Sequence, residues 1–188
     1  MPKQTNNIVM HGTRGMFGNQ VVFKRRGGES YVSAPPETDP NRVPTNPQQV
    51  IRDRFKGSAV YATSAMEDAD MKAAYQAKVK GNQSAYNVAF RDAFNPPEVH
   101  GAITQGYVGQ VGNLIVVQAS DDFKVHSVLV SIHNASGELI EEGAAEFSGR
   151  GLSWSYMVTQ ANATVAGSKI TATAVDLPGN EASLEILL

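Results

Sequence analysis

The sequence contains no cysteine, one tryptophan and no long hydrophobic run. The lack of cysteine excludes a disulfide framework, a thiolate metal site and a cysteine nucleophile. The longest apolar stretches, such as residues 114–117, are far shorter than the roughly 20 residues that a membrane helix needs. We therefore predict no membrane span. The formal net charge is only −2 at pH 7, so the whole molecule does not resemble a nucleic-acid-binding protein.

What the chain does have is the composition of a folded protein. Of its 188 residues, 41% are hydrophobic and 18% are charged, which suits a globular protein better than a disordered one. This length is enough for two small cores or one large core.

The charge is unevenly distributed along the chain. Residues 1–97 contain 13 Lys or Arg and 8 Asp or Glu, whereas residues 98–188 contain 3 and 10. The pair Pro96-Pro97 separates these halves, and proline stops a helix. We predict two domains, 1–97 and 98–188. Either two domains of different composition were joined, or the basic half of one copy contacts the acidic half of the next.

The first half begins with a predicted β-hairpin at residues 19–34. β-forming residues flank Gly27-Gly28, and such glycines supply the positive φ that a tight turn requires. Gly12, Gly15 and Gly18 lie upstream at intervals of three. A phosphate-binding loop needs a strand before its glycines and a helix after them, and here a strand follows. We interpret these three as turn glycines.

A proline-rich segment, residues 35–47, follows the hairpin and excludes helix and central strand. We expect it to lie extended across a surface. A helix is predicted to begin with Asn46 as N-cap and Pro47 in the first position, with Gln49 completing a capping box. Its predicted buried stripe has the three-and-four spacing of one helix face: Ile51, Phe55, Ala59 and Ala62.

Two further helices are predicted before residue 97. The second begins after Ser64, which forms a capping box with Glu67. Its predicted apolar face consists of Met71, Ala74, Tyr75 and Val79. The third occupies residues 84–94 and places three aromatic side chains on one side: Tyr86, Phe90 and Phe94. Packing within a helical core explains these aromatics better than a ligand cage does.

The second half shows short β-rich segments separated by turns, at the spacing of a β-sandwich. One strand shows an alternating pattern, in which Val128, Val130 and Ile132 are separated by Leu129 and Ser131. This spacing places the first three side chains on one buried face of the strand. Trp154 and Tyr156 share a face and are predicted to anchor the core. The seven predicted strands are 102–107, 113–119, 125–133, 143–147, 152–158, 169–176 and 182–187.

Three motifs in the first half, in the order 18–28, 46–55 and 84–90, resemble a class of small uncharacterised proteins from bacterial, often Bacteroidota, and phage genomes. The resemblance indicates the kinds of genome in which such proteins are encoded and does not imply an activity. Tyr75 departs from that class, which commonly has tryptophan there. The residues that carry the likeness are all interpreted as structural: Gly18, Asn19, Phe23, Asn46, Pro47, Arg54, Tyr86, Asn87 and Phe90.

Residues 84–90 are also similar to the opening of an HMG box, a minor-groove DNA-bending domain. In that family about three helices follow the motif, whereas here one helical segment precedes the double proline. We therefore favour the first resemblance.

In the second half, residues 117–125 and 170–180 resemble bacterial Ig-like modules. The resemblance implies an Ig-like sandwich and leaves the function open, because this scaffold has many roles. The predicted fold is thus an α+β N-terminal domain, a β-hairpin with about three helices, followed by an all-β Ig-like sandwich. Asp121, Asp122 and Asp176 are candidate calcium ligands, although solvated turn residues are the simpler interpretation.

The sequence contains no recognisable catalytic motif. The histidines, His11, His100, His126 and His133, lack the spacing of helical metal ligands, and Glu138, Glu141 and Glu142 fit a solvated hairpin better than paired catalytic carboxylates. We predict no enzyme activity and no catalytic, cofactor-binding or metal site.

Two hypotheses about function remain. In the first, the protein is a structural subunit of a virion, phage-like particle or other large bacterial assembly. It oligomerises through its N-terminal domain with itself and other assembly proteins, and displays the Ig-like domain. In the second, end loops 134–138 or 177–181 bind a surface glycan or protein. Nucleic-acid binding by residues 24–26 is a weaker third idea. Because the polar N-terminus lacks secretory-signal features, we expect synthesis in the cytoplasm and incorporation into a virion or extracellular particle.

Overall fold

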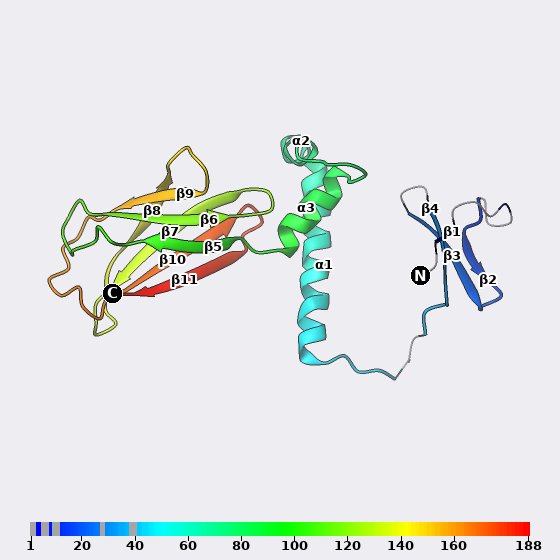
Figure 1. The fold of residues 1–188 in the computed structure, drawn as a ribbon, viewed down its shortest axis with the longest axis horizontal. Helices are drawn as coiled ribbons and strands as arrows, with labels where there is room; N and C mark the ends of the chain where they lie inside the picture. Colours follow the sequence, from blue (N-terminus) through cyan, green and yellow to red (C-terminus); the bar gives the residue numbers. More distant parts are fainter. Residues whose placement is uncertain (1–2, 5–7, 9–11, 27–28, 38–40) are drawn as a thin grey trace. The chain divides into compact units, whose positions relative to one another are not determined.

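The computed structural model describes residues 3–4, 8, 12–26, 29–37 and 41–188 (Figure 1). The chain forms two compact units, Met1–Gln48 and Gln49–Leu188. Pro96-Pro97, the predicted domain boundary, lies where the chain passes from the last helix to the first strand of the larger sheet. Both of those elements belong to the second unit. No helix among the described residues is long and apolar enough to cross a membrane.

The first unit is a four-stranded antiparallel sheet in the order β1-β4-β3-β2. The predicted hairpin is β3 (Val21–Arg26) with β4 (Glu29–Ser33), in the register Phe23 opposite Val32. Its predicted turn, Gly27-Gly28, lies outside the described residues, as do Pro40 and His11.

The short strands β1 (Lys3–Gln4) and β2 (Gly15–Phe17) extend this sheet beyond the prediction. A tight turn joins β2 to β3. Gly18 and Asn19 have φ of +57° and +56°, and Gln20 N–H donates to the Phe17 carbonyl at 3.1 Å. Two successive positive φ values suit the twist of a hairpin, which confirms Gly18 as a turn glycine.

Three helices follow: α1 (Asn46–Glu67), α2 (Ala69–Gln76) and α3 (Ala85–Phe94). The predicted cap of α1 was wrong by one residue. Gln48 Oε1 accepts from the backbone N–H of Thr45 at 3.2 Å. This is the reciprocal bond of a capping box, so Thr45 caps the helix and Asn46 is already helical.

The predicted start of the second helix was also wrong. α1 continues past Ser64, and the break falls at Asp68, whose carboxylate accepts from the backbone N–H groups of Asp70 and Met71 at 2.9 Å each. A carboxylate that satisfies two free N–H groups at the positive end of a helix is a stronger cap than an isolated hydroxyl. The third helix agrees with the predicted segment 84–94, and Ser84 is its N-cap.

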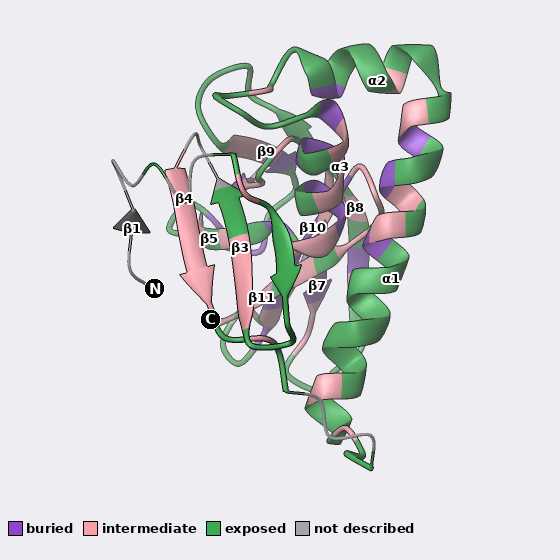
Figure 2. Ribbon diagram, turned by 90° about the vertical axis from the view of Figure 1, so that its right-hand side faces the viewer, coloured by how far each residue is buried: buried purple, intermediate pink, exposed green. Residues whose placement is uncertain are grey.

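The predicted stripe of α1 is buried only in its C-terminal half. Ala62 is fully buried and Ala59 is half-buried, but Ile51 and Phe55 remain 58% and 56% exposed. Figure 2 shows the same division, because the buried residues of α1 lie in the half that passes the other helices. α3 has 10 residues and α2 has 8, so these helices are too short to cover the whole length of α1, which has 22 residues.

The aromatic row of α3 forms as predicted. The rings of Tyr86, Phe90 and Phe94 stack with centroid separations of 6.4 and 5.9 Å. Phe55 of α1 meets Phe90 edge-on at 4.8 Å. On α2, Tyr75 is fully buried as predicted, whereas Ala74 is exposed.

The larger sheet consists of seven antiparallel strands. Six of the predicted strands overlap one observed strand each, whereas the first, 102–107, was placed too late and shares only residues 102–103 with the observed strand Glu98–Ile103. The order of the observed strands is β11-β10-β7-β8-β9-β6-β5. β8 pairs with β7 through its first part and with β9 through its last residues, so the sheet folds into two layers. The strands are β5 (Glu98–Ile103), β6 (Leu114–Ser120), β7 (Val125–His133), β8 (Leu139–Phe147), β9 (Ser153–Met157), β10 (Lys169–Asp176) and β11 (Glu181–Leu187).

The core lies between these layers. The alternation predicted for β7 is confirmed, since Val128, Val130 and Ile132 are fully buried. Tyr156 is buried, and Trp154 is half-buried at the edge of the same cluster. Burial of such apolar side chains contributes about 1.5–3 kcal/mol each and holds the two layers together.

The helices pack against one end of this sheet. Phe123, in the turn between β6 and β7, contacts Tyr75 with ring centroids 4.3 Å apart. Asn180, in the turn between β10 and β11, donates its side-chain N–H to the Ala93 carbonyl of α3 at 3.3 Å. These two turns and α3 together form the site described next.

Candidate functional site

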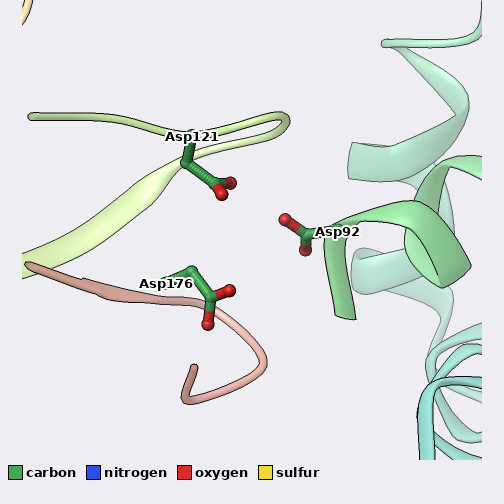
Figure 3. Close-up of side chains that lie close together, drawn as sticks. All are labelled: Asp92, Asp121 and Asp176. Carbon is green, nitrogen blue, oxygen red and sulfur yellow. The ribbon is translucent and has the colours of Figure 1, made fainter. Parts of the chain in front are cut away.

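Three aspartates meet where the helices contact the sheet. Asp92 belongs to α3, Asp121 follows β6, and Asp176 is the last residue of β10. One carboxylate oxygen from each lies within 4.8 Å of the other two. Figure 3 shows the three side chains pointing toward one another from separate elements. Residues 92, 121 and 176 are distant in sequence, so only the packing of the helices on the sheet end brings them together.

Local turn chemistry holds Asp121 in place. Its Oδ2 accepts from the backbone N–H groups of Phe123 and Lys124 at 2.8 and 2.9 Å. This side-chain-to-backbone pattern is the usual way in which aspartate stabilises a turn. The other oxygen, Oδ1, is buried and has no hydrogen-bond partner among the described residues.

Asp176 is held by the turn that follows it. Its Oδ1 accepts from the N–H groups of Gly179 and Asn180 at 2.8 and 2.6 Å, and its Oδ2 accepts from the Asn180 side chain at 2.7 Å. Gly179 has a φ of +93°, a conformation that glycine adopts without strain. The Pro178-Gly179-Asn180 turn therefore positions a buried carboxylate.

Asp92 projects from the buried face of α3 and is fully buried. Its Oδ2 accepts from the Tyr75 hydroxyl at 2.5 Å, and that hydroxyl lies 2.9 Å from the Tyr61 hydroxyl. The remaining oxygen of Asp92, Oδ1, has no hydrogen-bond partner in the described part of the chain. A buried carboxylate oxygen without a donor is costly.

The electrostatics of the site follow from this crowding. Burial raises the pKa of Asp92 to about 7, and the neighbouring carboxyls of Asp121 and Asp176 raise it further against the opposing hydrogen bond from Tyr75. Burial also raises the pKa of Asp176, although its hydrogen bonds act in the other direction. The pKa of Tyr75 is raised by burial and by its bond to Asp92, so its hydroxyl stays protonated.

No basic side chain of the described residues forms an ion pair with these three carboxylates. Arg91, beside Asp92 in sequence, instead pairs with Asp122 at 3.2 Å, and Asp122 also accepts from the Asn95 side chain at 2.7 Å. The structure therefore brings together two of the candidate calcium ligands, Asp121 and Asp176, and directs the third, Asp122, elsewhere.

The sequence interpretation missed Asp92, although a signal was present. Asp92 lies four residues after Val88 and three after Ala89, on the apolar face of a predicted helix. A charged residue on a buried face requires a partner. The partners come from the other half of the chain, so helical spacing alone did not reveal them.

The interpretation of Glu138, Glu141 and Glu142 as a solvated hairpin is wrong for Glu141. Glu141 is buried, and its Oε2 accepts from the Tyr156 hydroxyl at 3.0 Å and from Thr159 N–H at 2.9 Å. Glu138 accepts from the Asn134 side chain in its hairpin turn at 2.8 Å. Glu142 is exposed. Each has a separate environment, as expected if they do not act as a pair.

The two predicted binding loops differ in their surroundings. Loop 177–181 lies at the helical end, since Asn180 bonds to α3 and Leu177 packs against the helix cluster. Loop 134–138 is at the opposite end and largely exposed, with Gly137 at a φ of +84°. In the N-terminal sheet, Lys24 and Arg25 of the basic tip are exposed.

The arrangement of Asp92, Asp121 and Asp176 suits two occupants. It can share a proton, because a carboxyl with a pKa near 7 is readily protonated. It can also hold a hard cation, because carboxylate oxygens are the ligands that calcium and magnesium prefer.

Comparison with protein-family models and with curated proteins found no match. Among solved structures, the crystal structure of an engineered protein at 1.98 Å resolution is similar to this chain. The similar region covers 55% of this chain and 25% of the engineered protein. The identity is 15% and the TM-score is 0.35, a likeness too low to support any conclusion about this chain.

Proposed function

We propose that the protein is a structural subunit of a virion, phage-like particle or other large bacterial assembly. It associates with copies of itself through its N-terminal part and presents the sheet domain. The observation that carries this proposal is the uncovered apolar stripe of α1. The proposal also includes synthesis in the cytoplasm followed by incorporation into the particle.

The apolar stripe of α1 continues beyond the helices that cover it. Ala62 and Ala65 are buried, and about two to four turns earlier, on the same face, Ile51 and Phe55 are more than half exposed. Exposed large apolar residues in continuity with a core commonly mark a contact surface. A second copy of the chain is the occupant we propose.

The distribution of charge favours a second copy. Residues 49–188 contain 10 Lys or Arg and 15 Asp or Glu, whereas residues 1–48 contain 6 and 3. Arg52, Arg54 and Lys56 are interspersed with the stripe and are exposed. Basic residues around an apolar contact suit the acidic sheet domain of a neighbouring copy, because complementary charge directs association.

For the sheet domain, we propose the Ig-like fold. If β5 to β11 are strands A to G, the observed order contains β8-β9-β6-β5, or D-E-B-A, and β11-β10-β7, or G-F-C. The orders E-B-A and G-F-C agree with the two sheets of an immunoglobulin-type sandwich, whereas β8 pairs mainly with β7 and joins β9 only through its last two residues. The strand order supports the resemblance of residues 117–125 and 170–180 to bacterial Ig-like modules. The resemblance of the first half to bacterial and phage proteins agrees with an assembly role.

Size-exclusion chromatography with light scattering tests the assembly proposal. We expect the full-length chain in 150 mM NaCl to form oligomers whose mass increases with protein concentration. The double substitution Ile51→Ser and Phe55→Ser should reduce the mass to that of a monomer. Val60→Ser is the matched control, because Val60 is 70% exposed and lies nine residues from Ile51, which is 180° around a helix.

A wild-type chain that stays monomeric at every concentration would contradict the proposal. So would oligomers that persist in the double variant, or that dissociate equally in the Val60 variant. Circular dichroism of each variant should show unchanged secondary structure, since the altered side chains are exposed.

A second candidate function has one observation in its favour. Val108, Val111, Leu114 and Met157 are exposed at the end of the sheet where loop 134–138 lies, away from the helices. An apolar patch beside an exposed loop suits a protein or glycan ligand. Retention on a glycan array, lost on Val111→Ser, would favour this alternative.

A further inference from the structure

The cluster of Asp92, Asp121 and Asp176 has a feature that local folding does not explain. The side chain of Asp92 is fully buried and points toward the other two carboxylates (Figure 3), and its Oδ1 has no hydrogen-bond partner among the described residues. We propose that these three aspartates bind a hard divalent cation of the calcium type. This inference is independent of the assembly proposal.

Two carboxylate oxygens of the cluster lack a hydrogen-bond donor among the described residues. Oδ1 of Asp92 and Oδ1 of Asp121 are buried without a donor in the described structure. Oδ2 of Asp176 accepts a single N–H, from the Asn180 side chain, and retains acceptor capacity. Three elements therefore each offer a carboxylate oxygen to one point.

The spacing fits one ion. The three ligand oxygens lie within 4.8 Å of one another. Calcium binds oxygen at about 2.3–2.6 Å, so two oxygens on the same ion lie at most about 5 Å apart. An ion between the three side chains contacts all of them without rearrangement of the backbone.

Charge favours an ion over a proton. The cluster holds three carboxyl groups, and the four backbone N–H groups that donate to Asp121 and Asp176 carry no full positive charge. A single shared proton therefore leaves most of the negative charge buried. None of the ion pairs of the described residues includes these aspartates, so a divalent cation supplies the missing charge.

The cation would link the helices to the sheet, because its ligands come from both. Asp92 belongs to α3, whereas Asp121 and Asp176 belong to turns of the sheet. Because the ion binds the folded arrangement and not the separated elements, its binding stabilises the native state. With three protein carboxylates and the remaining ligands from backbone or water, we expect a dissociation constant on the order of 10⁻⁴ to 10⁻³ M.

Adjacent residues supply a matched control. Asp121 and Asp122 are neighbours in the same turn, but Asp122 is directed to Arg91 and Asn95. Asp121→Asn removes a ligand of the cluster, and Asp122→Asn removes the same charge next to it. Because Asp121 lies in a surface turn, its variant remains testable even if Asp92→Asn does not fold.

The test uses the full-length chain, stripped with EDTA and dialysed at pH 7.5. Calorimetric titration with CaCl2 should show one ion per chain, and 10 mM CaCl2 should raise the midpoint of thermal unfolding by several degrees. The Asp122→Asn variant should respond like the wild type. Asp121→Asn and Asp92→Asn should lose both the heat of binding and the rise in midpoint.

Two results would overturn the proposal. One is an equal rise in midpoint with NaCl at the same ionic strength, which would show screening rather than binding. The other is an absent calcium response, or one that Asp121→Asn retains; in that case a proton shared within the cluster, not a cation, occupies the site.

Discussion

At the scale of single residues, Glu141 has the most hydrogen bonds among the buried acids in the described part of the chain. Its Oε2 accepts from the Tyr156 hydroxyl, from Thr159 N–H and hydroxyl, and from Gln160 N–H. These donors come from β9 and the segment after it, whereas Glu141 belongs to β8. One carboxylate oxygen thus fixes the chain where it leaves the sheet.

Replacing this carboxylate should destabilise the fold. We expect Glu141→Ala to lower the free energy of unfolding by about 3 kcal/mol, because the buried Tyr156 hydroxyl and three part-buried donors of Thr159 and Gln160 lose their acceptor. Glu142→Ala is the control, since Glu142 is exposed, and it should change the free energy by less than about 0.5 kcal/mol. Urea denaturation measures both. Equal losses in the two variants would contradict the role of Glu141.

The same contact predicts an effect at alkaline pH. Burial, followed by the hydrogen bond to Glu141, raises the pKa of Tyr156 to about 12. The folded-state pKa exceeds the unfolded value near 10, so the stabilisation is complete below pH 10 and is lost between about pH 10 and 12. Urea denaturation between pH 9 and 12 should show this loss, and Tyr156→Phe should reduce it. A variant with an unchanged pH profile would contradict the assignment.

At the scale of elements, the boundary between α1 and α2 depends on one cap. Asp68 accepts from two backbone N–H groups, whereas the predicted cap, Ser64, lies inside α1. Ser64 and Glu67 have capping-box spacing, yet Ala62 and Ala65 continue the buried face through this region. Packing of α1 against its neighbours therefore overrides the local signal.

Substitution at these two positions distinguishes the caps. We expect Asp68→Ala to lower the free energy of unfolding by about 0.5–2 kcal/mol, the usual cost of losing a cap. Ser64→Ala should have little effect or stabilise slightly, because alanine favours the interior of a helix. Thermal denaturation followed by circular dichroism measures both. A larger loss for Ser64→Ala would restore the predicted boundary.

The sequence predicted the positions of the strands of the larger sheet more accurately than the ends and the buried face of the helices. The alternation of Val128, Val130 and Ile132 identifies a half-buried strand without knowledge of its neighbours, because the side-chain period of a strand is two. The strands β1 and β2 were missed, since two or three residues are too few to show a period. Ile51 and Phe55 have helical spacing, but spacing does not reveal where a neighbouring helix ends.

At the scale of the whole molecule, the boundary between the two compact units lies between Gln48 and Gln49. The predicted domain boundary was Pro96-Pro97, where the charge of the chain changes. Cluster contacts such as Phe123 with Tyr75 join the helices to the sheet, and these residues are 48 positions apart. Composition and proline content identify a change of secondary structure at Pro96-Pro97. They do not show which elements share a core.

The amino-acid sequence by itself determined six of the seven strands of the larger sheet, the third helix with its aromatic row and the turn glycine at residue 18, because each depends on short-range periodicity or backbone conformation. The tertiary structure alone decided that Asp92 joins Asp121 and Asp176, and that half of the α1 stripe stays uncovered. Both depend on contacts between distant segments, where packing geometry decides which side chains meet.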